Sequence, residues 1–248
     1  MSNENMTIGI LGGMGSLAAS AFLTSLVRAF PGEKEWDRPR TVLDNACHMP
    51  SRVRAILYGE HAEELTQQMA QHMAGLVNLG CTDIVLCCNT SHAFLPKVLP
   101  LAQQLCGEKP FTVHHIIRIL GESLRQKGIS HVSLLATEGT LDVGIYPSIL
   151  QEYGVTVDSA DQSIYPELRY LIEAVKQNKV DDEALSRFIA LVNNCPCPDV
   201  VLGCTEFPIF QSELCMRASE LCRNLHDPLQ ATIQALAGIH RAAEESVE

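Results

Sequence analysis

The chain repeats one short pattern in its two halves. DIVLCC (residues 83–88) lines up with DVVLGC (residues 199–204), so that Cys88 falls on Cys204, 116 residues later (204 − 88). TIGILGGMG near the start matches HVSLLATEG in the second half at a similar offset. Solenoid units repeat many times at a shorter period of about 20–50 residues, so this is not a solenoid. The repeat predicts two similar half-domains related by pseudo-symmetry.

Short apolar runs alternate with longer stretches of helical period in each half. Runs that are apolar throughout are typical of parallel strands whose two faces are both covered by helices. We therefore predict an α/β fold made of two parallel-sheet half-domains, with the active site in the cleft between them. Strands are expected in TIGILGG, TVLDNAC, DIVLCC, PFTVHH, HVSLLAT, GVTVD and DVVLGC, and helices in SLAASAFLTSLVRAF, HAEELTQQMAQHMAGLVNLG and SHAFLPKVLPLAQQLC.

Charge and hydropathy exclude several classes of partner. The 248 residues include 18 basic and 29 acidic ones, which gives a formal net charge of −11. This balance argues against a nucleic-acid partner and against an anionic membrane surface. No apolar run approaches the roughly 20 residues that a membrane span needs. The first residues carry no basic leader before their short apolar stretch, so we expect a cytoplasmic protein.

Two of the ten cysteines form a C-x-C pair in NCPCPD, Cys195 and Cys197. No second cysteine or histidine pair follows at zinc-site spacing, so the metal signal is weak. We expect a proline-bearing loop here, and no metal.

The repeat separates the two adjacent cysteines at positions 87 and 88. Cys87 aligns with Gly203 and has no counterpart, whereas Cys88 aligns with Cys204. Both paired cysteines follow a predicted strand, at the edge where open α/β sheets bind ligands. A thiol that faces a helix N-terminus there is expected to have a lowered pKa. Cys87 should be inert, and His92 should be a helix-start residue with a supporting hydrogen bond.

Two thiols that face each other across a cleft can invert a carbon centre. One sulfur removes a proton from one face while the other returns a proton to the opposite face, and no cofactor is required. The short polar residues after each cysteine suit a substrate carboxylate at two helix N-termini. The glycine-rich GGMG turn lets backbone approach a ligand, but lacks the nucleotide-binding patterns. The expected substrate-binding residues outside the arginine discussed below are Gly13, Met14, Asn89, Thr90, Thr205 and Glu206. For Glu206 a second role, as the cap of its helix, stays equally open.

Three motifs in order, GILGGMG, CNTSH and GCTE, resemble those of the aspartate/glutamate racemase family over nearly the whole chain. The resemblance implies enzymes that use no pyridoxal phosphate and no other cofactor, usually as homodimers. It assigns Cys88 and Cys204 as the catalytic acid/base pair, and assigns Asn89, Thr90 and Thr205 to the substrate's α-carboxylate and amino group. It also implies two domains, which we place at residues 1–113 with 226–248, and at residues 114–225.

One further match and one departure concern the substrate's side chain. MPSRVRAIL is similar to a family segment that places Arg52 at a distal carboxylate. The family often has a lysine in the second half, where a rough alignment puts Glu167, with Arg169 and Lys176 nearby. If Glu167 lines the site, the preference for aspartate or glutamate is in doubt.

The most favoured function is therefore a racemase acting on aspartate, glutamate or a related amino acid. The same superfamily includes hydantoin racemases, maleate isomerases and arylmalonate decarboxylases, so other chemistries stay open. A decarboxylase needs one proton-donating thiol and an apolar pocket, and a maleate isomerase uses one cysteine covalently. A non-catalytic amino-acid sensor would be expected to have lost one cysteine.

Overall fold

The computed structural model describes residues 6–245 except 31, 33, 108 and 218–223. The strands are β1 (Thr7–Leu11), β2 (Arg40–Asp44), β3 (Asp83–Leu86), β4 (Thr112–Val113), β5 (His131–Ala136), β6 (Thr156–Ser159), β7 (Val200–Gly203) and β8 (Leu225–His226). The α-helices are α1 (Ser16–Ala29), α2 (Arg52–Tyr58), α3 (Ala62–Asn78), α4 (Leu95–Cys106), α5 (Ile116–Gln126), α6 (Glu138–Val143), α7 (Ile145–Leu150), α8 (Tyr165–Lys176), α9 (Asp182–Asn193), α10 (Phe207–Arg217) and α11 (Pro228–Glu245). The 3-10 helices are η1 (Glu35–Asp37), η2 (Thr90–Phe94), η3 (Gln151–Tyr153) and η4 (Gln162–Ile164).

Within the described part of the chain, the strands form two four-stranded parallel sheets. Their orders are β2-β1-β3-β4 and β6-β5-β7-β8, which is the same order applied to successive sets of strands. The α/β prediction with two pseudo-symmetric sheets is thus confirmed. In each sheet the order reverses between the two central strands, and the carboxyl ends of strands at such a point are the usual place for a ligand. The four segments that leave these points contain Met14, Cys88, Thr137 and Cys204.

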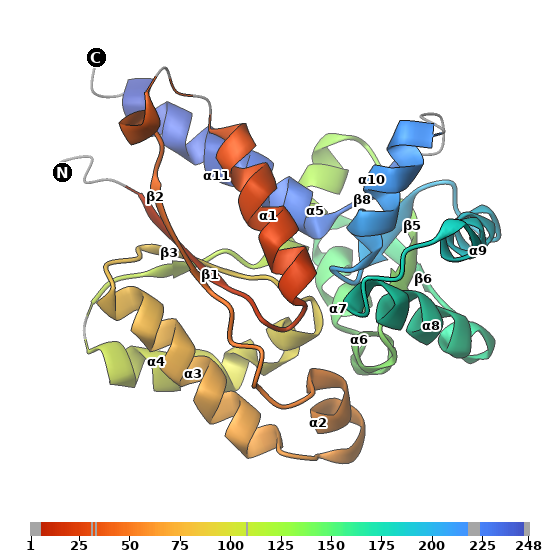
Figure 1. Cartoon of the computed structure of the whole chain (residues 1–248), viewed down its shortest axis with the longest axis horizontal. Helices are drawn as coiled ribbons and strands as arrows, with labels where there is room; N and C mark the ends of the chain where they lie inside the picture. The colour runs from red at the N-terminus through yellow and green to blue at the C-terminus, as the bar shows by residue number, and fades with distance from the viewer. Residues whose placement is uncertain (1–5, 31, 33, 108, 218–223, 246–248) are drawn as a thin grey trace.

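Helices cover both faces of the first sheet. Figure 1 shows α3 and α4 on one side of β1, β2 and β3, and α1 with α11 on the other. The side chains alternate accordingly, because successive residues of a strand point to opposite faces. Ile8 and Ile10 of β1 belong to a large cluster continuous with the second half, whereas Leu11 packs with α3 and α4.

The last helix, α11, contacts α1 from the first half and α5 from the second. The division into residues 1–113 with 226–248 and residues 114–225 stays a prediction. No helix in the described ranges is long and apolar enough to cross a membrane.

One helix near the site was not predicted. No secondary structure was expected for the MPSRVRAIL segment, and Arg52 is the first residue of α2. The Ser51 side chain caps this helix by accepting a hydrogen bond from the Arg54 backbone N–H, and Gly59 ends it with a positive φ. Such a cap satisfies one of the free N–H groups at a helix start. The helix packs against α6 of the second half, so it closes one side of the interface between the halves.

Candidate active site

The predicted catalytic cysteines line one small cavity between the two halves. This inner cavity has a volume of about 60 Å³. The predicted site residues that line it are Met14, Arg52, Cys88, Asn89, Thr90, Cys204, Thr205 and Glu206. Residues from both halves therefore meet here, as the repeat and the sheet topology require.

An outer cavity of about 380 Å³ continues from the inner one, and both are lined by Met14, Arg52 and Glu206. Gly13 lines only this outer cavity. Its φ is 78°, and a Cβ there would lie 2.3 Å from the backbone carbon of Ala46. Glycine is thus required at this turn, because any side chain would meet backbone.

The adjacent cysteines have opposite surroundings. Cys87 is fully buried in the core cluster that α11 covers, and burial raises the pKa of its thiol well above the usual value. Cys88 packs with the other face and lines the inner cavity. The side chains of Cys87 and Cys88 thus point to different faces, as expected from the repeat.

Glu206 lies beside the thiol of Cys204. The Cys204 Sγ donates a hydrogen bond to Glu206 Oε2 at 2.9 Å, and the Thr205 hydroxyl donates to the same oxygen at 3.2 Å. Burial raises the pKa of Cys204 well above its usual value, and the charge and hydrogen bond of Glu206 raise it further. This is the reverse of the lowered pKa expected from a helix N-terminus. Burial and Glu206 thus both favour the neutral thiol form of Cys204.

Asn89 and Thr90 are fixed by residues of the second half. The Tyr146 hydroxyl donates to Asn89 Oδ1 at 2.5 Å. The Thr90 hydroxyl lies 2.8 Å from that of Thr140 and 3.0 Å from that of Thr137. These buried bonds cross between the halves and orient both side chains toward the inner cavity, which both of them line.

Arg52 also lines the inner cavity, and its guanidinium is held by backbone oxygens. Its Nη2 donates to the carbonyl of Met14 at 2.9 Å, and its Nη1 donates to that of Pro50 at 3.0 Å. Arg54, two residues on, pairs instead with Glu60 on the surface.

A second cation, Lys176, was not assigned to the site from the sequence. It ends α8 and lines both cavities with Arg52. Burial lowers the pKa of its ammonium, but the nearby Glu173, Glu206 and Cys204 outweigh that effect and raise it overall. Glu167, which the rough alignment put at the family's lysine position, is outside both cavities and pairs with Arg187.

His92 is not among the residues that line either cavity. Its Nδ1 donates to the Cys88 carbonyl at 2.9 Å, so the ring supports the turn after β3. Burial, together with the neighbouring His115, lowers the pKa of His92 to about 3. The ring is therefore neutral at physiological pH.

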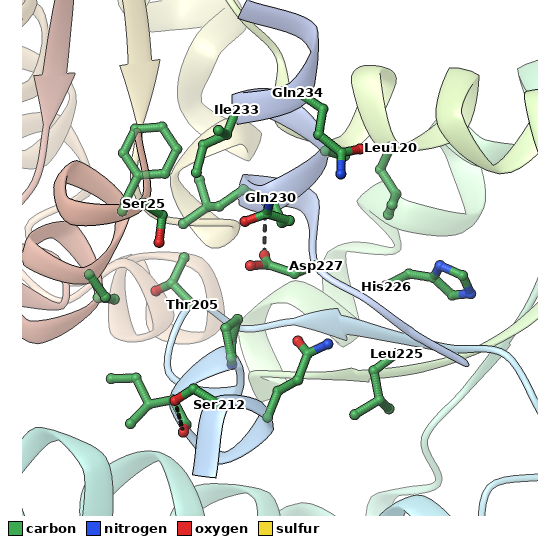
Figure 2. Close-up of a pocket in the computed structure, with 18 of the residues that line it drawn as sticks. Ser25, Leu120, Thr205, Ser212, Leu225, His226, Asp227, Gln230, Ile233 and Gln234 are labelled. Atoms are coloured by element: carbon green, nitrogen blue, oxygen red, sulfur yellow. Dashed lines mark hydrogen bonds between the residues drawn. The ribbon is translucent and has the colours of Figure 1, made fainter. Parts of the chain in front are cut away.

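A larger cavity of about 470 Å³ shares Thr205 with the inner cavity, and Figure 2 shows Thr205 among the residues that line it. Asp227 is the acid in it, and it caps α11 by accepting the Leu229 backbone N–H at 2.8 Å. Burial raises the pKa of Asp227 to about 6. Neither Cys88 nor Cys204 lines this cavity. The candidate site is therefore taken as the smaller cavities, where the two thiols meet buried polar atoms that have no hydrogen-bond partner among the described residues.

Comparison with known proteins identifies the family of the chain. The family model for Asp/Glu/hydantoin racemase matches residues 11–236. The glutamate racemase of Shewanella loihica is 29% identical over 175 residues, which are 68% of this chain and 62% of the relative. That of Roseobacter denitrificans is 27% identical over 187 residues, covering 71% of this chain and 66% of the relative. The chain thus matches less than two thirds of the length of these curated relatives.

Solved structures share the fold over nearly the whole chain. Picrophilus torridus aspartate racemase has a TM-score of 0.75 and 25% identity, covering 96% of this chain and 99% of that one. Glutamate racemase from Francisella tularensis, solved with D-glutamate, has a TM-score of 0.63 and 16% identity, covering 98% and 83%. From the extent of the family match and the paired cysteines in its motifs, this chain belongs to the Asp/Glu/hydantoin racemase family.

Proposed function

We propose that this protein is a cofactor-independent racemase of an acidic amino acid, with Cys88 and Cys204 as its two acid/base groups. One observation carries the proposal. Three residues of the inner cavity each have a buried polar atom without a hydrogen-bond partner among the described residues: Asn89 Nδ2, Glu206 Oε1 and Arg52 Nε. Buried polar atoms without a partner are rare and costly, so such a set points to a polar ligand.

These atoms complement the groups of an amino dicarboxylic acid. The Asn89 amide can donate to the α-carboxylate, with the hydroxyls of Thr90 and Thr205 beside it. Glu206 Oε1 can accept from the ammonium group, and Arg52 can donate to a distal carboxylate. Hydrogen bonds to charged groups of this kind are the strong ones.

The thiols supply the proton transfers. For one enantiomer, the thiolate of Cys88 takes the α-proton, and Cys204, held as a thiol beside Glu206, donates to the opposite face. For the other enantiomer the roles reverse. The pair then titrates as a unit, because each turnover transfers one proton from one sulfur to the other. No pyridoxal phosphate or metal is needed for this chemistry.

The other chemistries of the superfamily fit the cavity less well. A decarboxylase would need an apolar pocket for its leaving carboxylate, whereas Arg52, Lys176 and Glu206 line these walls. A maleate isomerase would use a single covalent cysteine, which leaves the second thiol unexplained. A sensor would not need Cys204 poised as a proton donor.

Deuterium exchange tests the reaction directly. Incubation with L-aspartate or L-glutamate in deuterium oxide should replace the α-proton by deuterium and produce the D-enantiomer, because the donating thiol has exchanged with solvent and returns a deuteron. NMR follows the α-proton signal, and chiral chromatography follows the enantiomers. Retention of the α-proton in acidic and neutral amino acids alike would refute the proposal.

Replacing Glu206 by Gln should shift the pH profile in one direction of the reaction. Glu206 raises the pKa of Cys204, and Cys204 must be a thiolate when it acts as the base. Loss of the negative charge lowers that pKa, so the rising limb for this enantiomer should move to lower pH. For the other enantiomer, where Cys88 is the base, the rising limb of the pH profile should move less.

Initial rates from each pure enantiomer, measured across pH, separate the two limbs. Glu167→Gln is the matched control, since Glu167 pairs with Arg187 outside both cavities. Equal shifts in both limbs, or none, would contradict a specific effect of Glu206 on Cys204.

We also propose a cytoplasmic location and a homodimer. The resemblance to the racemase family supports the homodimer, and light scattering of the purified protein measures it. Cell fractionation tests the location.

A further inference from the structure

Three side chains with metal-binding atoms meet at the end of the second sheet opposite to the thiols. His131 begins β5, Asp158 lies in β6, and Cys197 lies in the loop before β7. Their ligand atoms, His131 Nε2, Asp158 Oδ2 and Cys197 Sγ, all lie within 4.8 Å of one another. These residues are far apart in the sequence, so the parallel pairing of the strands creates the cluster.

The register of the sheet explains this meeting. Ser133 pairs with Asp158 across β5 and β6. His131 stands two residues before Ser133 and so lies on the same face of the sheet. The Ser133 hydroxyl accepts the backbone N–H of Cys197 at 3.0 Å, which fixes the loop over that face. Strand pairing and the Ser133 hydrogen bond therefore fix the backbone positions of all three residues.

The distances suit a tetrahedral ion. His131 Nε2 lies 3.0 Å from Asp158 Oδ2, and Cys197 Sγ lies 3.2 Å from the same oxygen. Zinc with its usual bond lengths to nitrogen, oxygen and sulfur holds ligand atoms about 3.3–3.6 Å apart. The two distances to Asp158 would need to lengthen by only a few tenths of an ångström, and the ligand atoms of His131 and Cys197 already lie within 4.8 Å of each other.

We propose that His131, Asp158 and Cys197 form a zinc site, with water as the fourth ligand. Thiolate and imidazole together select zinc over magnesium or calcium. The Cys197 side is buried, whereas His131 and Asp158 reach solvent, so an ion has a path of entry. Binding releases the thiol proton to solvent as the Zn–S bond forms.

The neighbouring Cys195 is excluded from this set by its orientation. Its Sγ contacts the carbonyl of Leu191 at 3.5 Å, on α9. Of the two cysteines in the C-x-C pair, Cys197 is therefore a candidate metal ligand and Cys195 is not. This makes Cys195→Ser a matched control, two residues away in the same loop.

Metal binding tests the proposal without reference to racemisation. Chelator-treated protein should take up one equivalent of Zn²⁺ per chain in competition with a chromophoric chelator. With Co²⁺ it should show a thiolate-to-metal absorption band. Cys197→Ser should remove that band, and Cys197→Ser, His131→Gln and Asp158→Asn should each weaken Zn²⁺ binding at least about 100-fold, the upper end of effects seen for supporting residues.

Two controls separate this site from others. Cys195→Ser should bind Zn²⁺ as the unchanged protein does. His61→Gln should also do so, since His61 pairs with Glu64 at a similar distance without a thiol. Thermal unfolding of the metal-free variants identifies any that fail to fold. If Cys197→Ser does not fold, the Zn²⁺ affinity of Asp158→Asn is used to test the site instead.

The proposal is overturned if the protein takes up no Zn²⁺, or if Cys197→Ser and Asp158→Asn both bind it unchanged. It is equally overturned if Cys195→Ser loses as much affinity as Cys197→Ser, which would mean a dithiol site. Loss of the Co²⁺ band in Cys88→Ser, with retention in Cys197→Ser, would place the metal at the proposed catalytic thiols instead.

Discussion

Cys88→Ser and Cys204→Ser should each lose most of the racemisation activity while keeping a different half-reaction. Each sulfur serves one face of the α-carbon, so inversion needs both. Loss of one general acid/base should reduce turnover by about 10²–10⁴-fold or more. Each variant should still exchange the α-proton of the one enantiomer that its remaining thiolate reaches. Proton NMR in deuterium oxide with each pure enantiomer measures this exchange.

Cys87→Ser is the matched control for that pair. Cys87 adjoins Cys88 in sequence but is fully buried in the core on the other face of β3. Its replacement should leave both exchange and inversion nearly intact, at some cost in stability from a hydroxyl in an apolar core. If Cys87→Ser were inactive and Cys88→Ser active, the assignment would be wrong. If all three variants were active, no thiol mechanism would remain.

The fold and the cysteine pair could be predicted because they depend on patterns local to each strand. The repeat paired Cys88 with Cys204, and the two-residue period of a strand separated Cys87 from Cys88. The structure adds a reason for the mismatch with Gly203, since a Cβ at Gly203 would lie 2.7 Å from the Leu134 side chain. A cysteine equivalent to Cys87 would therefore not fit at position 203 without a shift of Leu134.

Other features depend on how separate elements pack, and the sequence analysis did not find them. Lys176 reaches the cavity from the far end of α8, whereas an alignment compares positions and pointed to Glu167. The contact of Glu206 with Cys204 depends on one side-chain conformation within a buried turn. Cys197 was considered with Cys195, its neighbour in sequence, but its ligand-forming neighbours come from β5 and β6.

Arg52 and Lys176 should determine the preference for acidic substrates. Replacing Arg52 by Ala removes charged hydrogen bonds to a distal carboxylate, each worth about 1.5–3 kcal/mol. This corresponds to a loss of about 10- to 150-fold in kcat/KM for aspartate or glutamate. Neutral amino acids of similar size make no such bond, so kcat/KM for them should fall much less. Lys176→Met should act in the same sense, because its ammonium lines the same cavities.

Two matched controls test whether these effects come from the site rather than from surface charge. Arg54 pairs with Glu60 on the exposed side of α2, and Lys179 follows α8 with a bond to Gln177. Arg54→Ala and Lys179→Ala should leave the ratio of acidic to neutral substrates unchanged. The Arg52 guanidinium also donates to the Met14 carbonyl. If its loss only distorted that turn, kcat/KM would fall equally for acidic and neutral substrates. An equal loss would therefore reassign Arg52 to support of that turn, and Lys176 alone would then have to account for any acidic preference.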